Sequence, residues 1–400
     1  MRRLVMVFLF GTLCFLTFLP LAEATTDLPD KVSPDLRGLL DTQLEELDLG
    51  KLDSYINQLD QEISGHLPII SASRLVKSLT NGELPWSAWE LVKSLLIYLG
   101  REIAVNLSLL AKLLILTVAC AVLQNLSQAF GEGNAGKLAH AVAYLALLGL
   151  AFSSFSVAVG YSQRAIDSMV SFVHSFLPVL LPLVAASGAI TSAAVIHPAL
   201  LTFISALSAL IKNVVFPLIY CSLVVNLVSE FMEKSPVSRL GGFLRQVSFG
   251  LLGLGLTIFV GMLGIQGVGA AIKDGLALRS AKFVSMAFIP VVGKMFSDAM
   301  DAVLGTTLAL KNALGLAGAI IIVGLAAIPV LKILSLSLIY KAAAILAQPL
   351  GDMRLGSALD GMGGSLTLVF AAVAAVALML FIALGIIVGL TNLGSVMAAG

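Results

Sequence analysis

The feature that most constrains the fold of this chain is a series of apolar runs, each about as long as a helix needs to cross a bilayer, which is about 20 residues. In 400 residues, eight runs qualify: residues 103–126, 138–159, 172–190, 195–211, 214–228, 247–268, 314–330 and 366–390. Two weaker runs, 283–295 and 331–346, contain Pro, Gly or Lys. Since 58% of the residues are hydrophobic and only 12% are charged, the composition excludes a disordered chain, a nucleic-acid-binding protein and an ordinary soluble enzyme. We predict an all-α polytopic membrane protein with roughly seven to nine crossings, one or two of them broken or re-entrant.

Residues 1–24 have the three parts of a secretory signal. Two arginines precede an apolar stretch at residues 4–19, and Ala22-Glu23-Ala24 fits the small-x-small cleavage rule. We predict cleavage after Ala24, and the alternative is an uncleaved anchor helix. In both cases the segment that follows lies outside the cytoplasm.

Residues 25–99 form an acidic extracytoplasmic segment with apolar residues at helical spacing. Residues 25–102 contain 13 acidic and seven basic side chains, a net charge of −6, whereas the chain beyond them carries +6. Trp86 and Trp89 precede the first long apolar run, as interfacial anchors do, so we expect an interfacial helix over residues 87–99. The apolar stripes of this small helical region fit two roles, the docking of partner helices or packing into a domain of their own.

The orientation of the transmembrane domain, residues 100–400, is ambiguous in the sequence. Residues 229–242 and residues 271–282 are both basic, and each fits a cytoplasmic loop by the positive-inside rule. A single predicted crossing, 247–268, lies between them. The two assignments conflict, because one crossing places its two flanking loops on opposite sides of the membrane.

The C-terminal half carries the signs of an internal repeat, in which residues 165–272 correspond to residues 280–391. Three pairs of motifs match in the same order, at separations of 112, 120 and 122 residues: Phe176-Leu177-Pro178-Val179 with Phe288-Ile289-Pro290-Val291, Lys212 with Lys332, and Gly241-Gly242 with Gly363-Gly364. Two similar bundles in one chain are a plan that many transporters share.

Charged side chains near the apolar runs are the clearest polar signal, because each is costly in the bilayer interior. Three lysines stand within or between the runs: Lys112, Lys212 and Lys332. Lys294, Asp298 and Asp301 follow one another at i,i+4 and i,i+3, so they share one helix face. These residues fit an ion or polar-solute path. The alternative, which we prefer, is that the lysines snorkel to the interface and the acidic helix face is solvated.

No constellation in the sequence indicates an enzyme or a cofactor. Residues 131–137 match the first seven positions of a phosphate-binding loop, but Leu138 stands where Ser or Thr is required, so a short turn is the better interpretation. The polar link over residues 187–198, which ends in His197-Pro198, suits a tight hairpin or a re-entrant loop. We predict no catalytic residues, no metal ligands and no cofactor.

A last set of motifs carries a family resemblance. They are Thr191-Ser192-Ala193-Ala194 with His197-Pro198, then Gln266-Gly267, Asp274-Gly275, Arg279, Ala281-Lys282-Phe283, Phe288-Ile289-Pro290-Val291, Phe296, Asp298-Ala299, Asp301 and Leu310-Lys311-Asn312, and finally Leu338-Ile339-Tyr340-Lys341 and Gln348-Pro349-Leu350-Gly351. In these motifs the chain resembles the stage III sporulation protein AE family of endospore-forming bacteria, from the signal through Leu390. The family pattern has a polar residue where Ala287 stands, so no polar role is assigned there. Together with the charged residues already named, Lys112, Lys212, Lys294, Asp298, Asp301 and Lys332, the candidate functional or structural residues are Thr191, Ser192, His197, Pro198, Asp274, Arg279, Lys282, Pro290, Lys311 and Asn312.

The resemblance implies a polytopic membrane subunit of a sporulation-specific channel or secretion-like complex, which links mother cell and forespore and is needed for late forespore development. Its implied partners are the other subunits of the stage III sporulation A complex, including a secretion-type ATPase and ring-forming subunits. Its implied location is the mother-cell membrane around the forespore, with membrane lipid as a further partner and no nucleic acid. The alternative is a stand-alone secondary transporter for a small solute, which the repeat and the prolines in predicted helices suggest.

Overall fold

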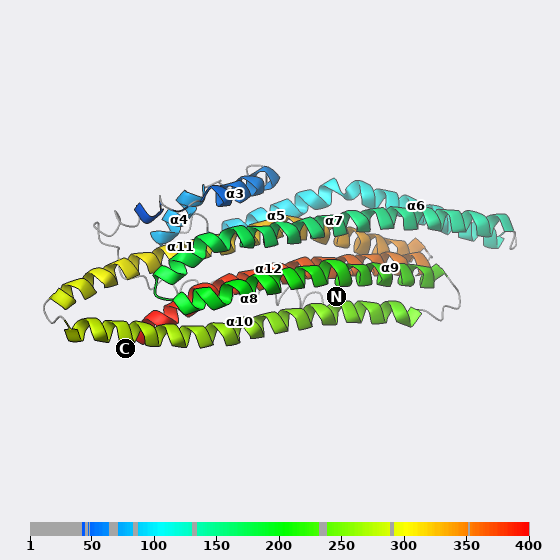
Figure 1. Cartoon of the computed structure of the whole chain (residues 1–400). Coiled ribbons are helices and arrows are strands. Elements are labelled where there is room, and N and C mark those ends of the chain that lie inside the picture. The colour runs from blue at the N-terminus through cyan, green and yellow to red at the C-terminus, as the bar shows by residue number, and fades with distance from the viewer. Residues whose placement is uncertain are drawn as a thin grey trace.

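The computed structural model of the chain contains only helices and the links between them in the part that it describes, residues 42–44, 47, 49–63, 71–82, 87–129, 134–231, 238–288, 292–350 and 353–399. Figure 1 shows a long bundle in which most helices run nearly parallel to one another. The predicted all-α class is confirmed, as expected for apolar runs that must satisfy their own backbone hydrogen bonds in lipid. The predicted signal and its cleavage site lie outside the described residues.

The described elements follow one another in three groups. The N-terminal helices are α3 (Gly50–Ile63), α4 (Ala72–Thr80) and α5 (Ala88–Val105). The next group contains α6 (Leu107–Ala129), α7 (Asn134–Ala186), α8 (Ile190–Leu210) and α9 (Phe216–Phe231), with a π-helical turn, η1 (Ile211–Val215), between α8 and α9. The last group contains α10 (Ser238–Phe288), α11 (Val292–Ala347), the short 3-10 turn η2 (Gln348–Leu350) and α12 (Met353–Ala399).

Five helical segments among the described residues are long and apolar enough to cross a membrane, and a sixth results if the bent pair formed by α5 and α6 counts as one span. The five are Phe152–Ala186, Ile190–Glu230, Arg239–Ala277, Val303–Ala347 and Arg354–Gly389. The number is lower than the sequence predicts because neighbouring apolar runs join: 195–211 and 214–228, for example, form one span through η1. The chain is a multi-pass membrane protein.

The long helices exceed the length that a bilayer requires. α7 has 53 residues and α11 has 56, which corresponds to about 80 Å at 1.5 Å per residue, against about 30 Å of hydrocarbon. Charged residues lie well inside these helices: Arg164 and Asp167 stand near the middle of α7, and Lys332 stands in the C-terminal third of α11. The helices continue through these charges, because a helix satisfies its backbone hydrogen bonds whatever side chains it carries.

The ends of the long helices lie at the two ends of the bundle (Figure 1). α6 joins α7, α9 joins α10 and α11 joins α12 at one end, whereas α7 joins α8 and α10 joins α11 at the other. The prediction of a loop over residues 271–282 is wrong, because these residues lie within α10, which is continuous from Ser238 to Phe288. α10 thus carries basic residues near both of its ends, Arg239 and Arg245 near one and Lys273, Arg279 and Lys282 near the other.

A tight turn joins α7 to α8. Gly188 has a φ of 90°, in the left-handed region that glycine adopts without steric cost. The N–H of Ala189 donates to the carbonyl of Val184 and that of Gly188 to Ala185, which closes the end of α7 in the manner of a Schellman motif. The predicted hairpin is thus limited to residues 187–189, and His197 and Pro198 lie inside α8.

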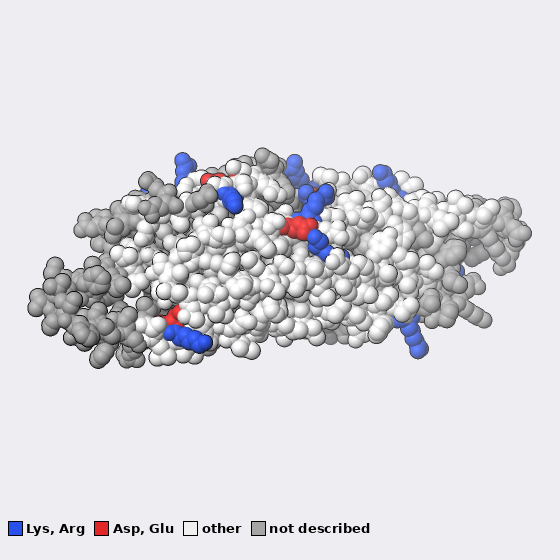
Figure 2. Space-filling model, in the orientation of Figure 1, with Lys and Arg blue, Asp and Glu red and all other residues white. Residues whose placement is uncertain are grey.

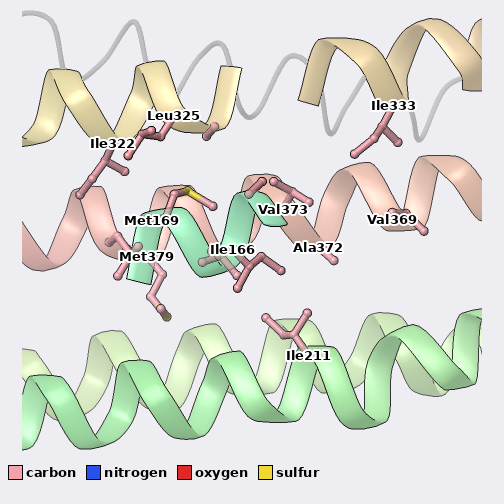
Figure 3. Packing of buried hydrophobic residues seen from close by; sticks show 14 of the residues in the cluster. Ile166, Met169, Ile211, Ile322, Leu325, Ile333, Val369, Ala372, Val373 and Met379 are labelled. Atoms are coloured by element: carbon pink, nitrogen blue, oxygen red, sulfur yellow. The ribbon is translucent and has the colours of Figure 1, made fainter. Parts of the chain in front are cut away.

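The core of the bundle lies between α7, α11 and α12, with η1 against them. Figure 3 shows apolar side chains from all four elements filling the space between the ribbons: Ile166 and Met169 of α7, Ile211 of η1, Ile322, Leu325 and Ile333 of α11, and Val369, Ala372, Val373 and Met379 of α12. The packing is close enough that α11 needs glycine. A Cβ on Gly318 would lie 2.6 Å from the ring of Phe176.

The N-terminal helices α3 and α4 pack against α7 and α11 (Figure 1). The ring of Tyr55 on α3 meets that of Phe172 on α7 edge-on, with centroids 5.3 Å apart. The carboxylate of Asp53 accepts the N–H of Ala72 at 2.6 Å, which fixes the start of α4 beside α3. The buried face of α4, with Val76 at its centre, belongs to the main core. The apolar stripes of these two helices are therefore covered by the transmembrane part of their own chain, an arrangement that neither predicted role describes.

The predicted interfacial helix begins where expected. Ser87 and Glu90 form a capping box at the start of α5, in which each side chain accepts the other residue's backbone N–H. Trp89 is 73% exposed in the first turn. The helix extends to Val105, farther than predicted, and meets α6 at a bend of 42°.

Candidate functional site

A strip of polar side chains lies midway along the bundle, where α7 passes η1 and α11. Five residues form this mid-bundle strip: Tyr161, Arg164 and Asp167 of α7, Lys212 of η1 and Lys332 of α11. The ammonium of Lys212 donates to Oδ1 of Asp167 at 2.5 Å. This ion pair joins residues 45 positions apart in the chain and fixes η1 against α7.

The ring of Tyr161 lies between two further cations of the strip. Cζ of Arg164 is 5.1 Å from the ring centroid, and Nζ of Lys332 is 5.2 Å from it. Both distances are within the range of a cation–π interaction, which gains strength where water is excluded. Lys332 is therefore held at α7 by a ring and Lys212 by a carboxylate.

The strip brings together the two lysines that the proposed repeat pairs. Lys212 and Lys332, which the sequence aligns at a separation of 120 residues, reach the same short stretch of α7 from η1 and from α11. Lys212 also lies in the π-helical turn, a backbone form that frequently occurs at functional sites. The two lysines are thereby related through one stretch of α7, from Tyr161 to Asp167.

The charged groups of the strip are not covered by the chain itself. The side chain of Asp167 is 55% exposed and that of Lys212 is 29% exposed, and Arg164 is also exposed. Figure 2 shows how sparse charges are on one flank of the bundle, where a small group of blue and red residues interrupts a largely white surface. Uncovered charges within apolar spans are expensive in lipid, so their presence marks a polar contact or a water-filled region.

A second cluster of candidate residues lies at the start of α8. Asp274 of α10, only 2% exposed, accepts the backbone N–H of Thr191 through Oδ1 and that of Ser192 through Oδ2, both at 2.8 Å. Ala189, the residue that precedes α8, has no side chain able to cap the helix. The carboxylate from another helix satisfies the free N–H groups in its place and lies at the positive end of the helix dipole. The hydroxyl of Ser192 is buried without a hydrogen-bond partner in the described part of the chain.

A third cluster contains Lys311 and Asn312 on α11. Lys311 is fully buried, and its ammonium donates to the backbone carbonyl of Val388 on α12 at 3.4 Å. Gly315, one turn later, lies against Val388, since a Cβ there would be too close to that side chain. Oδ1 of Asn312 is buried without a partner among the described groups. These residues join α11 to α12 where both approach the end of the bundle opposite η2.

The two Gly-Gly motifs of the proposed repeat have similar surroundings. In each, the carbonyl of the first glycine accepts a serine hydroxyl from the preceding helix: Gly241 from Ser222 at 2.7 Å and Gly363 from Ser337 at 2.8 Å. The carbonyl of Gly364 accepts Arg245 of α10 at 3.3 Å. The helix that carries each motif near its start is thus held closely against its predecessor, as small residues permit.

The remaining candidate residues are dispersed. Lys112 is exposed on α6, His197 is half-buried on α8 and Pro198 is exposed next to it. Arg279 and Lys282 belong to α10, and Lys294, Asp298 and Asp301 to α11, but their side chains lie outside the described set. Pro290 lies outside the described residues altogether. Among the described side chains, no group of three His, Cys, Asp or Glu residues is placed to hold a metal ion.

Sequence reasoning misses the three strip residues of α7. Tyr161, Arg164 and Asp167 fall between the predicted crossings 138–159 and 172–190, so the sequence places their charges in a loop. In the structure both runs belong to one helix, α7. The three residues between the runs therefore lie in the interior of a span and not in a loop. The only available signal is their spacing of three, which places them on one helix face.

Residues 70–391 of the chain match the family described as stage III sporulation protein AE. The chain is also similar to the stage III sporulation protein AE of Bacillus subtilis (strain 168), with 40% identity over 351 residues, which covers 88% of each protein. No solved structure matches the chain.

Proposed function

The chain belongs to the stage III sporulation protein AE family, a membership from which its role in sporulation follows, and we propose that it is the polytopic membrane subunit of a channel or secretion-like complex between mother cell and forespore. The proposed location is the mother-cell membrane that surrounds the forespore. The proposed partners are the other subunits of the stage III sporulation A complex, including a secretion-type ATPase and ring-forming subunits. The proposed role is non-enzymatic and serves late forespore development.

The observation that carries this proposal is the match over residues 70–391, which includes all five membrane-capable segments. The exposed charges of the mid-bundle strip support it, because a chain that worked alone in lipid would leave Arg164 and Asp167 uncovered at mid-span. A subunit of an assembly has neighbours that can cover them. The internal repeat remains part of the proposal, supported by the approach of Lys212 and Lys332 to one helix.

A stand-alone secondary transporter is the second candidate. The prolines within helices are the observation behind it, namely Pro178 and Pro182 in α7, Pro198 in α8 and Pro329 in α11, since transporters build substrate sites at broken helices; here each helix continues through its proline. A transporter should move a solute when it is purified and reconstituted alone. A complex subunit should show no such flux.

The test is quantitative co-purification from sporulating cells that express the full-length protein with an affinity tag. We expect the other stage III sporulation A membrane proteins to be recovered with it, and an unrelated tagged multi-pass protein of the same cells to recover none. Solute uptake by proteoliposomes that contain only this chain, without recovery of those proteins from cells, would favour the transporter and reject the complex.

A further inference from the structure

We propose that the mid-bundle strip, with the face of α7 that carries it, is the docking surface for a membrane-embedded helix of a partner subunit that bears an Asp or Glu side chain. This inference rests on the proposed function, because it assumes that the chain works within a complex. Beyond the proposed function, it names the face of the chain that a partner covers and the type of side chain that the partner contributes.

The first argument is the charge of the strip. Three cations, Arg164, Lys212 and Lys332, accompany one carboxylate, Asp167, which is already paired with Lys212. Arg164 and Lys332 share the ring of Tyr161 and have no ion-pair partner among the described residues. The strip is thus short of negative charge, and a carboxylate from outside would restore the balance at a depth where an unpaired cation is costly.

The second argument is the shape of the α7 surface. Exposed or half-exposed residues follow one face of the helix at helical spacing: Ser156, Gly160, Arg164, Asp167 and Ser171. Ser156 and Gly160 form a small-xxx-small pair next to the charges, and a Cβ on Gly160 would meet nothing within 4 Å. Small residues allow a second helix to approach closely in a membrane. The charges and the small residues together form one continuous face of α7, long enough for a second helix to pack along it.

The position of the strip argues against a lipid headgroup as the occupant. Asp167 lies in the interior of the span Phe152–Ala186, about 22 Å from the nearer end at 1.5 Å per residue. Lys332 lies equally far from the end of its own span at Ala347. Snorkelling to headgroups serves residues near the ends of helices.

Charge also argues against a second copy of this chain. A copy would present the same strip, with the same excess of cations, so pairing two strips would double the positive charge and not neutralise it. A different subunit with a membrane-embedded acidic residue is the complementary partner. The second copy and an anionic lipid become alternative outcomes of the test.

The first experiment maps the neighbour of the strip. A photo-crosslinking amino acid replaces Ser156 or Ser171 in the full-length protein, in sporulating cells, and Ile258 of α10, an exposed apolar residue, serves as the control position. We expect both α7 positions to crosslink to one membrane protein of the sporulation complex, at a peptide that contains Asp or Glu within an apolar helix. Crosslinks to this chain itself, to lipid only, or equally from Ile258 would overturn the proposal.

The second experiment reverses the charges. Arg164→Glu and Lys332→Glu should each lower recovery of the crosslinked partner at least about tenfold, whereas Arg164→Lys should retain it. Arg239→Glu, which reverses an exposed cation at the start of α10, is the matched control and should leave recovery unchanged. Changing the partner's acidic residue to Lys should restore recovery with Arg164→Glu.

The outcomes separate this inference from the proposed function. If the unaltered chain recovers no complex subunits, the proposed function fails. If it recovers them and the reversed variants, still present in the membrane at the normal level, recover the same amount, only the docking surface is refuted.

Discussion

Asp274 caps a helix to which it does not belong: its carboxylate on α10 accepts the backbone N–H of Ser192 in the first turn of α8 at 2.8 Å. The neighbouring N–H, that of Thr191, binds the other carboxylate oxygen. One buried side chain thereby fixes the turn between α7 and α8 against the far end of α10. The carboxylate of Asp274 supplies a negative charge and two acceptor oxygens to the start of α8. An amide side chain lacks the charge and has only one acceptor oxygen, and an alkyl side chain has neither.

Replacing Asp274 should therefore destabilise the bundle in a graded way. We expect Asp274→Ala to lower the free energy of unfolding by about 1.5–3 kcal/mol, because two N–H groups lose a charged acceptor. Asp274→Asn should cost less, since it keeps one oxygen. The measurement is denaturant unfolding of the purified protein in detergent, with Lys273→Ala, at the exposed neighbouring position, as a control that should leave stability unchanged.

The ion pair of the mid-bundle strip should appear as a coupling energy. A double-mutant cycle with Lys212→Met and Asp167→Asn, measured on the purified chain in detergent, should give an interaction of about 0.5–2 kcal/mol. The pair joins η1 to α7. Each substitution should therefore lower the free energy of unfolding more in the unaltered chain than in a chain that already carries the other substitution. Strict additivity would show that the two side chains do not interact.

The two contacts just described show what the sequence could not reveal. The all-α class and the membrane-capable apolar runs follow from composition and periodicity, which are local properties. The partner of Lys212 lies 45 positions away and that of Ser192 lies 82 positions away, so no local pattern indicates either. The sequence marks Lys212, Thr191, Ser192 and Asp274 as candidates but cannot say which of them meet.

The sequence divides the apolar stretches more finely than the described helices do, for a related reason. A charge between two apolar runs looks like a loop when each run is long enough to span alone, as with Arg164 and Asp167. Within one continuous helix such charges still find partners. Lys212 of η1 supplies a partner for Asp167, and Tyr161 of α7 itself supplies a ring for Arg164.

The close approach of α11 to α7 should make Gly318 intolerant of a methyl group. A Cβ at this position would lie 2.6 Å from the Phe176 ring, so Gly318→Ala should destabilise the protein by about 1–3 kcal/mol. Gly261→Ala on α10, where nothing lies within 4 Å of an added Cβ, should be neutral or slightly stabilising. Thermal unfolding in detergent compares the two variants, and equal melting temperatures would mean that α7 and α11 are not in contact there.

The packing of α4 on the bundle predicts how the N-terminal region responds to a buried charge. Val76 is fully buried in the main core, and Val76→Asp should detach α4 because an unpaired carboxylate cannot remain there. Limited proteolysis should then cut the region around residues 71–82 faster than in the unaltered protein. Ser73→Asp, on the exposed face of the same helix, is the control, and the same cleavage rate in both variants would show that α4 does not dock on this chain.

The placement of the helix connections predicts the outcome of cysteine labelling. In a chain whose native cysteines are all replaced by Ala, Arg239→Cys and Arg354→Cys should react with a membrane-impermeant reagent from the same side, because both lie at the starts of helices that share one end of the bundle. Ile190→Cys should react from the opposite side. Labelling of Arg239→Cys and Ile190→Cys from one side would refute this topology.

The π-helical turn at Ile211–Val215 sets the angular phase between α8 and α9. Buried residues recur at four-residue spacing before it, as with Leu200 and Ile204, and after it, as with Ile219 and Leu223. A turn closed by i→i+5 hydrogen bonds takes up one residue more than an ordinary α-helical turn, and one residue corresponds to about 100° around a helix. The π-helical turn therefore accommodates the additional residue within itself. As a result, the buried residues of α8 and those of α9 face the same core. Loss of one residue here would let α9 keep its orientation, whereas Lys212 would lose the wide turn that carries it to Asp167.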